Sequence, residues 1–264
     1  MLEATSAAPE SDRPLTLGRP LRLLSFNMQV GMPTDHYGHY VTGAWRHVLP
    51  SRGVRRNLDR IAELARDYDV VALQEADAGS LRTASVNQIE YLARRAGFQH
   101  WRLGVNRDFG PFAQHAIGLL SREPLHEVRH HALPGSLRGR GALEATILDA
   151  DHHPLQLMVA HLALSRGARA RQFHHLAELA RPDQDTLLLG DLNCEPDEIA
   201  AHPELRRLGF RIVHEAPTYP SWRPRRSIDH VLASPSVLTQ TCLVLPDRLS
   251  DHLAVSTEVR LRPR

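Results

Sequence analysis

Short apolar runs separated by turn residues recur along most of the chain. Their lengths and their Val, Ile, Leu and Thr content are typical of β-strands. They cover residues 22–27, 69–75, 116–121, 142–148, 155–162, 186–191, 228–234 and 253–261. The pattern therefore predicts a protein in which strands dominate.

Apolar residues at helical spacing predict helices over residues 54–68 and 168–180, and a third over 86–97. Gly97 is placed to end the third helix as a C-cap. The first two each have one apolar face: Val54, Leu58, Ile61 and Ala65 in one, Phe173, Leu176 and Ala180 in the other.

The first two helices each lead into a strand. This order is typical of two packed sheets with helices on their outer faces, and equally of an α/β barrel. Periodicity alone does not separate these two architectures.

Composition limits the possible functions. The chain has 264 residues, of which 42% are hydrophobic and 23% charged, so one large domain or two small ones can form a sizeable core. No apolar run approaches the ~20 residues that span a bilayer. The net charge of +2 implies no strong field for nucleic acid or membranes. All 32 basic residues are arginine, which excludes Schiff-base and P-loop chemistry that requires lysine.

The N-terminus and the cysteines indicate the compartment in which the protein works. Residues 1–20 lack a basic start followed by an apolar stretch, so we expect a flexible tail rather than a secretory signal. Cys194 and Cys242 are too few for a disulfide framework. A cytoplasmic location is the simplest expectation.

Polar side chains gather where the predicted strands end or begin. Because strand ends collect along one edge of a sheet, these side chains are expected at one rim. Taken singly, each has an ordinary structural role as well; Asp77, for example, could cap the turn after residues 69–75. The residues are Asn27, Glu75, His161, Asp191, Asn193, Asp229, Asp251 and His252.

The chemistry of this set is coherent. Hard oxygen donors suit Mg²⁺ or Mn²⁺, whereas a Cys-rich or His-rich zinc cage is not present at the usual spacing. An Asp–His pair can orient and charge an imidazole, and Asn can donate to a developing negative oxygen. Together these groups predict metal-assisted attack of water on phosphorus.

Eight strings occur in the order of a known family: LLSFNMQVG, DVVALQEAD, LLSREPL, RGALEATI, VAHLALS, LLLGDLN, SIDHVLAS and LSDHLAVSTEV. On these strings the chain resembles the endonuclease/exonuclease/phosphatase superfamily over roughly residues 21 to 260. The resemblance implies a four-layered α/β-sandwich, with two mostly antiparallel sheets flanked by helices, in a single domain over residues 21–264.

The resemblance also implies roles at the metal and at the attacking water. Asn27 and Glu75 match the family's metal-binding residues, and Asp251 contributes to the metal shell. Asp191 is similar to the residue that positions or deprotonates water, with Asn193 as its partner. The number of metal ions and the identity of the general base stay open.

Further roles concern the phosphate. His252 resembles the histidine that contacts the scissile phosphate, held by Asp229, and His161 resembles a second phosphate-contacting histidine. The chain departs from the family's usual pattern at Leu192, where Phe is common, and at His115, where nuclease members often have Asn. The departure at His115 means that the family's phosphate or base contacts do not carry over directly to this segment, and His115 itself is a candidate for substrate binding.

A segment over residues 32–53 is expected to lie beside the rim and to touch substrate. Its candidates are Trp45, Arg46 and Arg52; a buried aromatic anchor and solvated arginines are the ordinary alternatives. His36 and His39 have the spacing of a partial zinc site, without a third ligand in evidence. The arginines of residues 165–171 oppose a helix dipole, which indicates an anionic ligand or a neighbouring acidic loop.

These observations favour a divalent-metal-dependent hydrolase of a phosphoester, with a phosphodiester preferred. A nuclease acting on DNA or RNA is an alternative, although a stronger basic stripe and more stacking aromatics would then be expected. A non-catalytic phospholigand-binding protein and a zinc hydrolase of a different fold are further alternatives. The substrate stays open among phospholipid, small molecule and nucleic acid.

Overall fold

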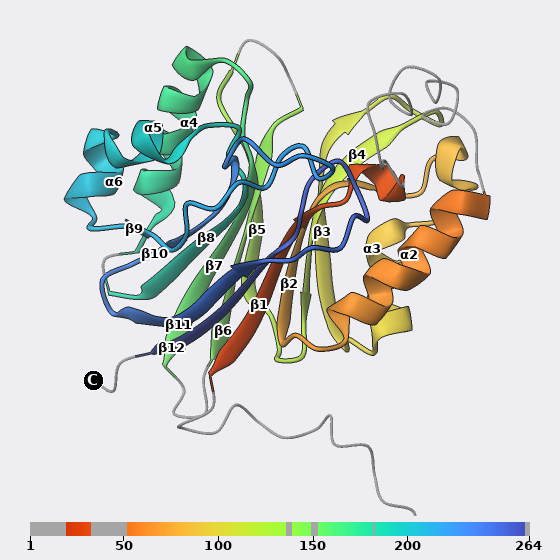
Figure 1. Ribbon diagram of the computed structural model, residues 1–264, viewed down its shortest axis with the longest axis horizontal. Coiled ribbons are helices and arrows are strands. Elements are labelled where there is room, and N and C mark those ends of the chain that lie inside the picture. The colour runs from red at the N-terminus through yellow and green to blue at the C-terminus, as the bar shows by residue number, and fades with distance from the viewer. Residues whose placement is uncertain (1–19, 33–51, 136–138, 149–152, 182, 262–264) are drawn as a thin grey trace, which may run out of the picture.

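Two six-stranded β-sheets pack face to face in the computed structural model of the chain (Figure 1). The structure describes residues 20–32, 52–135, 139–148, 153–181 and 183–261. The predicted N-terminal tail lies outside the described residues, apart from Pro20. Within the part of the chain that is described, no helix has the length and apolar character needed to cross a membrane.

The first sheet has the strand order β11-β12-β1-β2-β4-β3. β1 and β2 run parallel, and the other neighbours are antiparallel. The strands are β1 Leu21–Asn27, β2 Val70–Asp77, β3 His100–Asp108, β4 Gln114–Ser121, β11 Val237–Val244 and β12 Val255–Leu261.

The second sheet has the order β5-β6-β7-β8-β10-β9, again with one parallel pair, β7 and β8. Both sheets thus place a parallel pair near their centre, so the carboxyl ends of neighbouring strands lie at one rim. The strands are β5 His126–Ala132, β6 Gly141–Leu148, β7 Pro154–His161, β8 Asp185–Asp191, β9 Arg211–Ile212 and β10 Asp229–Ala233.

Helices cover the outer face of each sheet (Figure 1). α2 Arg52–Ala65 and α3 Gln88–Ala96 lie on the first sheet; α4 Arg166–Leu179, α5 Pro196–Ala200 and α6 Pro203–Arg207 lie on the second. Short 3₁₀ turns follow β1 and β2, at Gln29–Gly31 and Leu81–Thr83. The four-layered sandwich is confirmed, and the barrel alternative is wrong.

The described part of the chain has three apolar cores: one between the two sheets, and one between each sheet and its helices. They explain why the central strands are continuous apolar runs in the sequence. In β8, Leu187 and Leu189 pack between the sheets, whereas Leu188 packs beneath α4 with Phe173. A strand that is covered on both faces needs apolar residues at successive positions. Each such leucine contributes roughly 1.5–3 kcal/mol by its burial.

The helices also follow their sequence signals. Leu58, Ile61 and Ala65 of α2 are buried against the first sheet, as predicted. α3 begins at Asn87, whose side chain accepts from two backbone amides, and ends at Gly97 with φ 79°, which confirms the C-cap. α2 ends at Ala65, three residues earlier than the predicted boundary of 68.

The strands that the apolar pattern did not predict are β3, β5, β9 and β11. Each of them lies at one end of a sheet. The residues of β5 are exposed or half-buried throughout, and β11 carries one row of exposed residues. An edge strand covered on one face or less lacks the apolar run that marks a central strand, which is why these were missed.

Candidate active site

The carboxyl ends of β1, β7 and β8 meet at one rim of the sandwich. In the register of the second sheet, Asp191 lies opposite His161 on one side and Asp229 on the other. Asn27, at the end of β1 in the first sheet, donates from Nδ2 to Asp191 Oδ2 over 3.0 Å. This hydrogen bond joins the two sheets at the rim, and all four side chains are buried.

The residue before Asp191 explains how the strand reaches this position. Gly190 has φ 144°, and a Cβ there would lie 1.9 Å from the carbonyl oxygen of Ala160 in the adjacent strand. Only glycine therefore permits β8 to approach β7 this closely. After Asp191, the backbone amide of Asn193 donates to Asp191 Oδ1 over 3.0 Å, and Asn193 Nδ2 donates to the Leu162 carbonyl.

His252 forms a buried pair with Asp229. Its Nδ1 lies 2.9 Å from Asp229 Oδ2, and its Nε2 lies 3.9 Å from Asp191 Oδ2. Burial by itself would lower the pKa of His252, but the carboxylates of Asp229 and Asp191 outweigh it and raise the pKa to about 10. Thr218 donates its hydroxyl to Asp229, which fixes the carboxylate from the other side.

His161, unlike His252, is neutral. Its Nε2 lies 3.4 Å from Asp191 Oδ2 and 3.7 Å from Glu75 Oε1. Its Nδ1 lies 2.8 Å from Nη1 of Arg140. Burial lowers the pKa of His161 well below its usual range, and the neighbouring arginine charge lowers it further. The site therefore contains one neutral and one charged imidazole.

Glu75 reaches the site through an irregularity in β2. The register between β2 and β4 shifts between Leu73 and Ala76, and Glu75 has φ 52°. A positive φ in a residue other than glycine is uncommon and indicates a backbone position that its surroundings hold in place. The bulge turns the Glu75 side chain toward His161, with 33% of it exposed to solvent.

Asp251 completes the group of acidic residues. It follows Ser250, whose hydroxyl donates to the backbone carbonyl of Asn27 over 2.7 Å and so ties this loop to the end of β1. Burial raises the pKa of Asp251 to about 6, with the Glu75 carboxylate adding to the effect. Burial likewise raises the pKa of Asp191 to about 7, with Asp229 and Glu75 contributing.

This charge pattern fits a divalent cation. Glu75, Asp191 and Asp251 bring carboxylates together, and the pKa values of the two aspartates are raised mainly by burial, with the Glu75 carboxylate adding to the effect. Oxygen donors of this kind suit Mg²⁺ or Mn²⁺. One group of potential ligand atoms, from Asp191, Asp229 and His252, lies within 4.8 Å of one another. Since Asp229 and His252 hydrogen-bond each other, we favour Asn27, Glu75 and Asp251 as the cation's ligands.

The predicted substrate-binding residues have different outcomes. His115 is half-buried on β4 and lines a cavity with Glu75 and His161. Trp45 and Arg46, like His36 and His39 of the zinc alternative, lie outside the described residues. Arg52 begins α2, but its side chain is not among those described.

Residues that sequence reasoning did not select also contact the site. Arg140 begins the RGALEATI string, so a signal was present there. Thr218, bonded to Asp229, and Tyr219, whose ring centroid lies 4.9 Å from that of His252, belong to a loop without a distinctive pattern. Their contact with the site depends on how that loop folds back.

Comparisons with known proteins agree with this fold. Residues 24–252 match the family described as the Endonuclease/Exonuclease/phosphatase family. A search of curated proteins finds no match. Among solved structures, an endonuclease/exonuclease/phosphatase from Beutenbergia cavernae is 23% identical with a TM-score of 0.72, covering 92% of this chain and 72% of that chain.

Two further solved structures have named activities or ligands of their own. A mannosyl-6-phosphatase from Bacteroides thetaiotaomicron is 15% identical with a TM-score of 0.68, over 91% of this chain and 100% of that chain. The human Nocturnin catalytic domain with a bound sulfate anion is 17% identical with a TM-score of 0.64, over 98% and 100%. At such identities the likeness shows the fold alone.

Proposed function

We propose, from the premise that the chain belongs to the endonuclease/exonuclease/phosphatase family, that it hydrolyses a phosphodiester by in-line attack of water with a divalent metal ion. Members of this family are phosphoester hydrolases. The observation that carries the proposal is the convergence of Asn27, His161 and His252 on one carboxylate, that of Asp191.

Asp191 is assigned to the attacking water. A carboxylate with a pKa of about 7 can accept a proton near neutral pH, which suits a general base. Asn27 holds one of its oxygens, and the Asn193 amide holds the other. Both bonds keep the carboxylate in one orientation, so the proton-accepting oxygen faces the site.

The two histidines are assigned to the phosphate. His252 is charged, and its Nδ1 is engaged by Asp229, so Nε2 is left to donate to a phosphate oxygen. His161 is neutral and buried, and it places a ring nitrogen beside Asp191 without adding a second full charge. This division follows from the pKa values of the two imidazoles.

Asn27, Glu75 and Asp251 are assigned to Mg²⁺ or Mn²⁺, which when bound would neutralise charge on the phosphate and polarise its P–O bond. Glu75 is more exposed to solvent than the two other acidic residues near Asp191, which are Asp229 and Asp251. The bulge in β2 that aims it at the site has no evident purpose in packing, because its side chain is partly exposed.

The substrate and the location are also proposals. The small net charge and the low aromatic content of 5% favour a small molecule or lipid over a nucleic acid, with a nuclease as the alternative within the family. A cytoplasmic location remains consistent with two unpaired cysteines.

The test is Mg²⁺- and Mn²⁺-dependent hydrolysis of bis(p-nitrophenyl) phosphate by the wild type and by Asp191→Ala. We expect Asp191→Ala to lower kcat by roughly 10²–10⁴-fold, the usual contribution of a positioned acid or base. Asp59→Asn, on α2 away from the rim, is the matched control. Equal rates for the wild type and Asp191→Ala would refute the catalytic role, and activity on plasmid DNA alone would favour the nuclease.

A further inference from the structure

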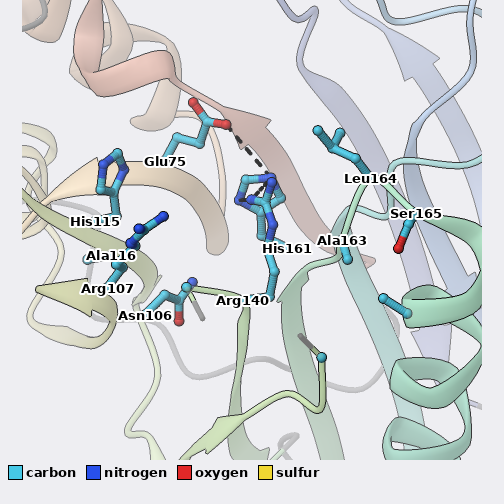
Figure 2. Close-up of a pocket in the computed structure, with 13 residues that line it drawn as sticks. Glu75, Asn106, Arg107, His115, Ala116, Arg140, His161, Ala163, Leu164 and Ser165 are labelled. Atoms are coloured by element: carbon cyan, nitrogen blue, oxygen red, sulfur yellow. Dashed lines mark hydrogen bonds and ion pairs between the residues drawn. The ribbon is translucent and has the colours of Figure 1, made fainter. Parts of the chain in front are cut away.

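A cavity of about 340 Å³ opens beside the candidate active site, toward the start of α4 (Figure 2). Glu75 and His161 form one part of its wall and belong to the site already described. The steps proposed above do not use the rest of the lining, which includes Arg107, Arg140 and Leu164. A cavity of this volume suits a small molecule better than a nucleic-acid duplex.

Arg107 is held in place on β3 although it is exposed. Its guanidinium carbon lies 4.3 Å from the centre of the Phe109 ring, a cation–π contact. On another side, a Cβ at Gly139 would come within 2.9 Å of Arg107 Cδ, so the glycine leaves room for this side chain.

Arg140 approaches the same cavity from the start of β6. It contacts His161, and burial lowers its pKa, although the charges of Glu75 and Asp191 act in the opposite direction. Within the residues that the structure describes, neither Arg107 nor Arg140 forms an ion pair with a carboxylate. By contrast, Arg82 and Arg169, which are buried, lie 2.5 and 2.7 Å from Asp77 and Glu198.

The start of α4 adds positive potential to the same wall. Ser165 and Leu164 line the cavity, and among the described contacts the Ser165 side chain makes no capping hydrogen bond. The first turn of α4 contains no acidic residue, so the positive end of the helix dipole is not compensated there. Arg169 does not add to this wall, because it pairs with Glu198, the acidic neighbour that the sequence indicated as an alternative.

We propose that this cavity is a second anion subsite, in which Arg107 and Arg140 bind a phosphate group of the substrate other than the scissile one. The inference rests on the proposed function and narrows its substrate to a small molecule with at least two phosphate groups. Arginine is suited to this task because its planar guanidinium donates two parallel hydrogen bonds to one phosphate.

The experiment measures binding with probes that the enzyme does not hydrolyse. Propylphosphonate carries one anionic group, and alkane-1,ω-bisphosphonates with linkers of two to five carbons carry two. Calorimetric titration at one fixed free Mg²⁺ concentration gives Kd for each probe. Because calorimetry does not depend on turnover, the subsite is tested even if the hydrolysis assay fails, and the two proposals can fail separately.

The wild type is expected to bind at least one bisphosphonate about tenfold more tightly than propylphosphonate, which corresponds to one good charge-assisted contact. Arg107→Gln is expected to remove most of this preference. Arg140→Lys keeps the charge but loses the paired geometry, so it should reduce the preference in part. Arg102→Gln is the matched control, an exposed arginine on β3 outside the cavity, and should keep the preference.

Two results would overturn the subsite. One is a Kd ratio near one for every linker length in the wild type. The other is an undiminished preference for bisphosphonates in Arg107→Gln, with circular dichroism confirming that the variant is folded. Inhibition of bis(p-nitrophenyl) phosphate hydrolysis by the same probes gives a second readout, and it should rank the variants in the same order.

Discussion

Two aspartates at the ends of strands, Asp77 and Asp191, expose almost nothing to solvent, yet their pKa values shift in opposite directions. Their exposed fractions are 0% and 2%. Asp77 accepts from the backbone amides of Gly79 and Ser80, from the Ser80 hydroxyl, and from Arg82 Nε. Burial alone would raise its pKa, but these donors outweigh it and lower the pKa to about 2.

Asp191 has fewer donors and more negative neighbours. Asn27 and Asn193 donate to it and the charge of His252 lowers its pKa, but burial, together with the carboxylates of Asp229 and Glu75, outweighs them and raises the pKa to about 7. A carboxylate whose charge is fully compensated is fixed as part of the structure. One that is buried and under-compensated keeps basicity and an affinity for cations, which chemistry can use. Asp77 thus caps the turn after β2, as the sequence suggested, while Glu75 of the same strand points to the candidate active site.

The largest expected effect comes from substituting Asp191. Asp191→Asn removes the proposed proton acceptor, so we expect kcat to fall by about 10³-fold, equivalent to about 4 kcal/mol of transition-state stabilisation. Because the change also removes an under-compensated buried charge, the free energy of unfolding in metal-free buffer should stay equal or rise. Steady-state kinetics and urea denaturation check both parts. A variant that loses activity by unfolding would contradict the expectation.

The same substitution at Asp77 should have the reverse outcome. Asp77→Asn leaves Arg82 buried without its counter-charge and sets an amide NH₂ against backbone donors, at a cost of roughly 3 kcal/mol in unfolding free energy. Urea denaturation measures this cost. Asp59→Asn is the control, because its pairing with Arg95 is half-exposed and contributes under ~1 kcal/mol. A cost for Asp77→Asn as small as that of the control would show that the turn does not depend on compensation.

A bound metal ion should compensate the negative charge around Asp191, which the protein's own donors do not. Mg²⁺ at 100 times its Kd should stabilise the folded chain by about 2.7 kcal/mol, and EDTA should remove this gain. The shift in Tm should shrink in Glu75→Gln, because one oxygen ligand loses its charge. Differential scanning fluorimetry over a Mg²⁺ series measures it. An equal shift in the wild type and Glu75→Gln would exclude Glu75 as a ligand.

The smallest effect concerns a second compensated carboxylate, Glu144, on the outer face of the second sheet. Burial would raise its pKa, but hydrogen bonds from His131 and Gln156 and the charge of Arg181 outweigh it and lower the pKa. A lowered pKa means that its stabilising contribution is present above the ordinary glutamate range and is lost as the pH falls through the folded-state pKa.

Glu144→Gln should therefore flatten the acid side of the curve of unfolding free energy against pH. Urea denaturation of both proteins between neutral pH and pH 3 measures the two slopes. Parallel curves for the wild type and Glu144→Gln would show that the carboxylate gains nothing from its partners. No loss of hydrolytic activity is expected, because Glu144 lies away from the rim.

Much of the fold could be predicted from the sequence, and the successes share a cause. β1, β2, β7 and β8 are covered on both faces, so their apolar runs are long and their types are clear. The edge strands β3, β5, β9 and β11 gain their hydrogen bonds from a single neighbour and have little apolar pattern of their own. Their existence depends on partners that are distant in sequence.

Much of the site was predictable as well, but only as a set of residues. The strand-end positions named Asn27, His161, Asp191, Asp229 and His252, and the structure brings these together. Thr218 and Tyr219 were missed because nothing local marks a loop that folds back onto a histidine. Arg107, which the proposed subsite uses, was not selected because its position depends on Phe109 and Gly139, which surround it only in the folded chain.

The sequence by itself determined which segments form the central layers, which family the chain belongs to, and which polar side chains strand ends deliver to one rim. These properties follow from local periodicity and from the order of short motifs. Only the tertiary structure decided which of two aspartates has a lowered pKa and which a raised one, and which of two histidines is charged. Those states are set by desolvation and by charges from segments far apart in the chain, and both arise only when the two sheets close on each other.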